Sequence, residues 1–123
     1  MNRFKGNLNK DYGTKLIDFS FNGRKFEVRC TEHSLIRFKE RHLDVNVSLG
    51  DIVSLGKDRL YKMAKNGDDV AIINQSKHQS TIITFESDGN ETQVRIRTII
   101  ARSNIYVKTG TKVFNLKNYK GGF

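Results

Sequence analysis

Cysteine, long apolar runs and, near one end, acidic residues are scarce in this chain of 123 residues. Cys30 is the single cysteine, which excludes an internal disulfide or a multi-cysteine zinc site and favours a buried structural thiol over a nucleophile. No apolar run is long enough to cross a bilayer, and residues 1–7 lack the apolar stretch of a secretion signal. We therefore expect a cytoplasmic protein that is not a membrane protein.

Several motifs of common enzyme classes are also missing. The chain has no glycine-rich phosphate loop, no nucleophile elbow and no clustered metal-ligand spacing, and its histidines are scattered. We expect neither a metal site nor a cofactor.

Positive charge is what the chain has in excess. It contains 22 Lys and Arg against 13 Asp and Glu, for a net charge of +9. Residues 92–123 hold basic residues and no acid, whereas residues 66–91 are rich in acids and hold only Lys77 as a cation. This asymmetry is typical of a protein that binds a phosphate backbone, because neutralised phosphates release counterions. An anionic membrane, an acidic protein partner or solubility alone would fit the same charge.

The length and the 37% apolar content suit one hydrophobic core. We expect a single α+β domain over residues 16–117, between flexible tails at 1–15 and 118–123. Residues 16–21 and 25–30 alternate around the turn signal Asn22-Gly23, which predicts a hairpin.

Two helices are expected next. The first covers residues 31–43 with Thr31 as its N-cap. The second runs from Ser48, which forms a capping-box variant with Asp51, to the stop signal Asn66-Gly67.

The remaining residues read as β-strands with short links, which predicts an antiparallel meander. The expected strands are 70–73, 80–85, 93–101, 105–108 and 112–114, with turns at 88–90 and 109–111. The predicted fold is α+β, with a hairpin and two helices packed on one face of a curled antiparallel sheet.

The first helix carries the strongest functional signal. His33, Arg37 and Arg41 follow an i, i+4, i+8 spacing and therefore share one side of the helix, opposite an apolar side. A titratable imidazole beside two fixed guanidinium charges could bind and cleave a phosphodiester. A solvated helix face, on which Glu40 pairs with Arg37 or Lys39, would explain the same residues.

The central strand carries a second signal. Alternation from Val94 to Ile100 places Thr98 with the apolar residues on one face and Arg95 with Arg97 on the other. Paired guanidinium groups give bidentate hydrogen bonds to phosphate and can neutralise a phosphorane transition state. A solvated sheet face with cross-strand partners such as Glu86 is the alternative.

The order of these elements over residues 24–116, with the motif His33-Ser34-x-x-Arg37-x-x-x-Arg41 and an Arg97-Thr98 strand, resembles a family. It is similar to the small barnase, EndoU and RelE-like ribonuclease toxins. The resemblance implies metal-independent cleavage of RNA, in which the 2′-hydroxyl attacks the adjacent phosphate. It also implies an inhibitory protein partner.

Carried over residue by residue, the resemblance makes His33 the general base or acid, Arg37 and Arg41 phosphate clamps, and Thr98 a hydrogen-bond donor. These enzymes often carry a further functional residue in the terminal strands, and Tyr106 and Lys112 are the nearest substitutes.

A second hypothesis explains the positive charge without catalysis. In it the chain is a non-catalytic basic module that binds nucleic acid or occludes the nucleic-acid site of a protein partner. The expected nucleic-acid-binding residues lie on the sheet and in the C-terminal third: Arg95, Arg97, Arg102, Lys108 and Lys112.

Overall fold

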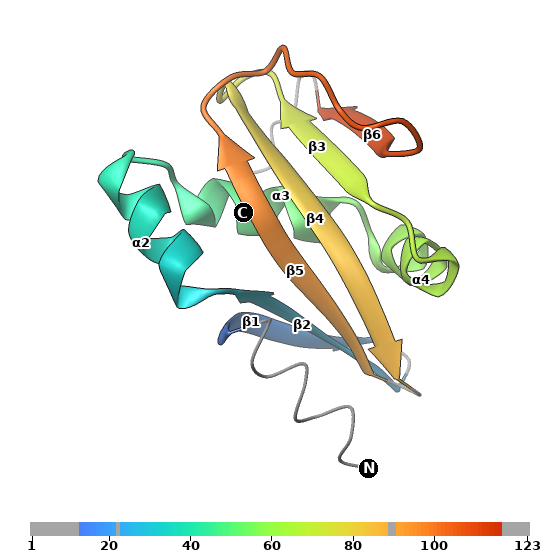
Figure 1. Ribbon diagram of the computed structural model, residues 1–123. Helices are drawn as coiled ribbons and strands as arrows, with labels where there is room; N and C mark the ends of the chain where they lie inside the picture. Colours follow the sequence, from blue (N-terminus) through green and yellow to red (C-terminus); the bar gives the residue numbers. More distant parts are fainter. Residues whose placement is uncertain (1–12, 22, 89–90, 117–123) are drawn as a thin grey trace.

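One mixed sheet and three helices make up the part of the chain that the computed structural model describes, which is residues 13–21, 23–88 and 91–116 (Figure 1). The strands are β1 (Thr14–Phe21), β2 (Arg24–Cys30), β3 (Val70–Asn74), β4 (Gln79–Asp88), β5 (Glu91–Ile100) and β6 (Lys112–Leu116). The helices are α2 (Glu32–Glu40), α3 (Val45–Ser54) and α4 (Lys57–Asn66). The predicted α+β class is confirmed.

The ends of the described chain bear on the predicted tails. Strand β1 begins at Thr14, inside the segment 1–15 that the sequence assigns to a tail. Residues 1–12 and the tail predicted at 118–123 lie outside the described residues. Within the described ranges, no helix has the length and apolar content that a membrane span requires.

The six strands lie in the order β1-β2-β5-β4-β3-β6. The pairs β1/β2, β3/β4 and β4/β5 are antiparallel, but β2 runs parallel to β5 and β3 runs parallel to β6. The prediction of an antiparallel sheet was therefore wrong in these two pairs. Parallel neighbours need long connections, which the helices and the β3/β4 hairpin provide for β2 and β5.

Helix α2 begins as predicted. The Thr31 side chain accepts a hydrogen bond from the backbone N–H of Ser34 at 3.1 Å, which confirms Thr31 as the N-cap. The helix ends at Glu40, before the predicted Leu43, because His42 takes the left-handed conformation with φ 57°. The N–H groups of His42 and Leu43 then return to the carbonyls of Lys39 and Phe38, the pattern of a Schellman motif.

The second predicted helix is two helices. Gly56, with φ 89°, separates α3 from α4, and a residue in this backbone region interrupts helical hydrogen bonding. The predicted end is confirmed, because Gly67 caps α4 in the left-handed conformation with φ 72°. The prediction of two helices was wrong at Gly56.

The predicted capping box at Ser48 was also wrong. Helix α3 begins at Val45, and its N-cap is Asp44, whose side chain accepts a hydrogen bond from the Asn46 N–H at 2.9 Å. Ser48 is fully buried and lies 2.6 Å from the Thr81 hydroxyl on β4. The Ser48 hydroxyl therefore forms a tertiary hydrogen bond and does not cap a helix.

Asp51, the other half of the predicted box, lies in the interior. It is 1% exposed, and its Oδ1 accepts a hydrogen bond from Asn74 Nδ2 at 2.8 Å. Its Oδ2 has no hydrogen-bond partner among the residues that the structure describes. Burial raises the pKa of Asp51 to about 6, against the smaller lowering effect of Asn74.

The core fills the space between one face of the sheet and the three helices. Its buried members are Phe26, Val28, Cys30, Phe38, Leu49, Ile52, Leu55, Leu60, Met63, Val70, Ile72, Ile83, Val94, Ile96 and Ile99. Cys30 is buried, as predicted, and burial raises the pKa of its thiol to about 11.

Candidate nucleic-acid site

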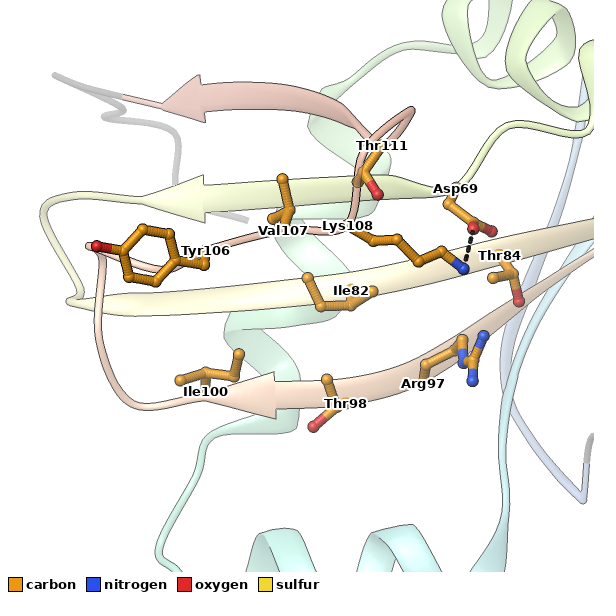
Figure 2. Close-up of a pocket in the computed structure, with 10 residues that line it drawn as sticks. All are labelled: Asp69, Ile82, Thr84, Arg97, Thr98, Ile100, Tyr106, Val107, Lys108 and Thr111. Carbon is orange, nitrogen blue, oxygen red and sulfur yellow. Dashed lines mark ion pairs between the residues drawn. The ribbon is translucent and has the colours of Figure 1, made fainter.

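The site lies on the face of the sheet opposite helix α3. In Figure 1 α3 passes behind β4 and β5, and the front of these strands carries no helix. Residues 101–111 leave β5, run back over the sheet and lead into β6 (Figure 2). The predicted strand at residues 105–108 was wrong, because this stretch is irregular and crosses the sheet face without joining its ladder.

The crossing segment, residues 101–111, is held at both ends. Near its start, the Ser80 hydroxyl donates a hydrogen bond to the Arg102 carbonyl at 2.7 Å. Near its end, Thr111 N–H donates to the Lys108 carbonyl at 3.1 Å, which forms the predicted turn. Lys112 N–H then donates to the Asp69 carbonyl at 2.9 Å. The bonds at Arg102 and Lys112 thus tie the two ends of the segment to β4 and to the residue that precedes β3.

A cavity of about 400 Å³ lies between the crossing segment and the sheet. Figure 2 shows its lining, in which the side chains of β4 and β5 form the floor and the crossing segment forms one wall. The lining residues are Asp69, Ile82, Thr84, Arg97, Thr98, Ile100, Tyr106, Val107, Lys108 and Thr111. The cavity thus combines apolar side chains, hydroxyl groups and charges of both signs.

A β-bulge decides which residues of β5 face this cavity. Ile82 of β4 pairs with Thr98, and the next residue, Ile83, pairs with Ile96, which leaves Arg97 as the extra residue. The alternation of buried residues shifts by one position at the bulge: Val94, Ile96 and Ile99 are buried, whereas Thr98 and Ile100 are only half-buried. The predicted grouping of Thr98 and Ile100 with Ile96 was therefore wrong: both line the open-face cavity.

The charges of the site are mostly exposed. Lys108 Nζ lies 3.8 Å from Asp69 Oδ2, and the Lys108 side chain is 74% exposed. Outside the cavity, Lys112 Nζ lies 4.0 Å from Asp68 Oδ2. Arg97 is exposed and forms no ion pair with another residue of the described ranges. Its guanidinium group is available to an anion.

The structure brings three predicted site residues together in the cavity: Arg97, Thr98 and Lys108. Arg95 is half-buried on β5, Arg102 is exposed at the start of the crossing segment, and Lys112 is exposed on β6.

The helix motif lies outside the cavity lining. His33 and Arg37 are exposed on α2, and Arg41 is the exposed C-cap of that helix. Helix α2 contacts β5, the strand that carries Arg97 and Thr98, and lies beside it in Figure 1. The two predicted groups of residues therefore come from neighbouring elements.

Sequence reasoning missed part of the lining. The sequence indicates a strand at Ile82 and Thr84 without a role for either residue, and at Asp68-Asp69 it indicates a loop and not a pair of catalytic carboxylates. Only the pairing of β4 with β5 and the path of the crossing segment bring them to one cavity. Tyr106, named as a substitute catalytic residue, lies at the cavity with its side chain fully exposed.

Comparisons with protein-family models, curated proteins and solved structures found no match. Among the described residues, no group of three or more His, Cys, Asp or Glu is placed to hold a metal ion.

Proposed function

We propose that the protein is a small ribonuclease that cleaves RNA without a metal ion. One observation carries the proposal: helix α2, with His33 and Arg37 exposed, contacts the strand that places Arg97 and Thr98 beside an open cavity. The net charge of +9 supports attraction of a polyanion to this surface. The resemblance of the helix motif to ribonuclease toxins supports the same chemistry.

The proposed reaction moves two protons. The 2′-hydroxyl loses its proton as the bond from O2′ to phosphorus forms. The bond from phosphorus to O5′ breaks, and O5′ takes up a proton, which leaves a 2′,3′-cyclic phosphate and a 5′-hydroxyl end. His33 performs one of these transfers, because imidazole is the side chain suited to proton transfer near neutral pH.

Arginine side chains perform the electrostatic part of the proposal. Arg37 and Arg41 on the α2 side hold the reacting phosphate and offset the charge that develops on its oxygens, and Arg97 on β5 holds another phosphate of the same RNA strand. Thr98 donates a hydrogen bond from its hydroxyl. A cytoplasmic location and an inhibitory protein partner belong to the same proposal.

The test is cleavage of a labelled mixed-sequence RNA in chelator at low salt. We expect His33→Ala to lower the rate by at least about 100-fold, the usual contribution of a general acid or base, with RNA affinity nearly unchanged. Lys62→Gln is the matched control, because Lys62 is exposed on α4 and lies outside the cavity. Equal rates for wild type and His33→Ala would reject the catalytic role of His33.

A second candidate is a module that binds RNA without cleaving it. The observation in its favour is that the cavity holds the cations Arg97 and Lys108 but no histidine. In this case the same assay gives tight, salt-sensitive binding and intact RNA. Neither binding nor cleavage would reject both candidates and favour a protein partner.

A further inference from the structure

We propose that the cavity between the crossing segment and the sheet binds one unpaired nucleotide of an RNA strand. The inference rests on the proposed function, because it takes RNA as the ligand and names the part of the strand that this surface holds. In it the base stacks on Tyr106 and the apolar lining, and the phosphate binds to Arg97.

The lining matches the three chemical parts of a nucleotide. Ile82, Ile100 and Val107 offer apolar contact to the flat faces of a base. Thr84, Thr98 and Thr111 offer hydroxyl groups that both donate and accept hydrogen bonds, which suits base edges and ribose hydroxyls. A volume of about 400 Å³ lies in the range of small-molecule sites.

Tyr106 is the residue that favours a base over other ligands. Its side chain is fully exposed, and in Figure 2 the ring lies at the end of the lining that is farther from Arg97. The backbone on either side of Tyr106 is tied to the sheet by the hydrogen bonds from Ser80 to the Arg102 carbonyl and from Lys112 N–H to the Asp69 carbonyl. A solvated aromatic ring can stack on a base without first leaving a packed position.

Arg97 supplies the phosphate contact. As the extra residue of the bulge it stands at the opposite side of the lining from Tyr106 in Figure 2, so that base and phosphate contacts are separated. Its guanidinium group can donate two parallel hydrogen bonds to phosphate oxygens. Lys108, whose Nζ lies 3.8 Å from Asp69 Oδ2, also adds positive charge, but its ammonium group cannot donate two parallel hydrogen bonds.

The expected ligand is single-stranded because a base must leave its stack and its pair to enter the cavity. Bases in a duplex are stacked on both faces and cannot contact a tyrosine ring, whereas bases in loops and single strands can.

Binding is tested with a labelled 2′-O-methyl RNA octamer, which 2′-hydroxyl attack cannot cleave, and fluorescence anisotropy as the readout. We expect Tyr106→Ala to weaken binding at least about 5-fold and Arg97→Gln about 10-fold. Tyr106→Phe keeps the ring and should match wild type, as should Lys62→Gln. Because the side chains of Tyr106 and Arg97 are exposed, their substitution removes no core packing.

A second readout locates the nucleotide. Uridine and adenosine 5′-monophosphates are added to the protein, and amide chemical shifts are followed by NMR. We expect shifts at Thr84, Thr98 and Thr111. Shifts confined to other elements would overturn the inference.

The outcomes separate this inference from the proposed function. RNA that is cleaved normally and bound equally by wild type and Tyr106→Ala would overturn the inference and leave the ribonuclease intact. Binding that depends on Tyr106 without any cleavage would support the inference and reject the ribonuclease. Absence of any RNA binding would overturn both.

Discussion

Lys108 Nζ lies 3.8 Å from Asp69 Oδ2, and this ion pair joins the crossing segment to the residue that precedes β3 (Figure 2). The pair places a carboxylate inside a cavity that we propose for a polyanion. Since the Lys108 side chain is 74% exposed, the pair adds little to stability.

We expect Asp69→Asn to tighten RNA binding by about 2-fold to 5-fold and to change the free energy of unfolding by less than about 1 kcal/mol. The reason is that the change removes a negative charge from the cavity and releases Lys108 for phosphate. The measurement is anisotropy with the uncleavable octamer.

Asp18→Asn is the matched control for charge. It changes the net charge equally and breaks the exposed pair between Lys15 and Asp18 at 2.8 Å, but Asp18 is on edge strand β1 and not in the cavity lining. Equal gains in affinity for the two variants would mean that net charge alone, and not the cavity, governs binding.

The buried Asp51 makes stability depend on pH. Its folded-state pKa of about 6 lies above the ordinary value of 3.8, so its contribution to stability is fully present below about pH 4 and is lost as pH rises through 6. At neutral pH the charged carboxylate therefore costs up to about 3 kcal/mol. Asp51→Asn removes the charge and keeps an oxygen that can accept from Asn74.

We expect the free energy of unfolding of Asp51→Asn to increase relative to that of wild type as pH rises from 4 to 7.5. Urea unfolding of both proteins at several pH values measures this difference. A constant difference between the two curves across that range would contradict the burial of a proton-binding carboxylate at position 51.

Gly13 positions the start of helix α2. It has φ 71°, and a Cβ on this residue would lie 2.6 Å from the Cys30 carbonyl oxygen and 2.7 Å from Thr31 Cα. Both are backbone atoms, of the N-cap residue of α2 and of the residue before it, so they cannot rotate away. Gly13→Ala should lower stability by about 1–3 kcal/mol or more and, by displacing the helix that carries His33, should slow RNA cleavage.

Gly23→Ala is the control for Gly13→Ala. Gly23 also has a positive φ of 77°, but a Cβ there would meet nothing within 4 Å. Gly23→Ala therefore introduces a similar backbone strain to Gly13→Ala but no steric clash. Thermal unfolding that gives equal losses for the two variants would show that the contact with Cys30 and Thr31 is unimportant.

Three local signals in the sequence predicted the local structure correctly. The N-cap at Thr31, the stop at Gly67 and the turn at residues 109–111 depend on side-chain or backbone groups a few residues away, and all three are confirmed. The early end of α2 was missed because His42, and not glycine, takes the left-handed conformation there.

Long-range pairing explains what the sequence could not predict. The alternation around Arg97 is regular in the sequence, and the bulge exists only because Ile82 and Ile83 pair with Thr98 and Ile96. For the same reason, the residues that line the cavity with Thr98 could not be predicted, since they meet only when the crossing segment returns over the sheet.

The most direct measurement uses an oligonucleotide with a single ribonucleotide, all other positions being 2′-O-methyl, incubated with the protein in chelator. Our account predicts one cut, directly 3′ of the only free 2′-hydroxyl, with a 2′,3′-cyclic phosphate end and with cleavage by His33→Ala slowed at least about 100-fold. An uncut oligonucleotide, when a matched all-ribose strand is also left intact, would contradict the proposal that this protein cleaves RNA.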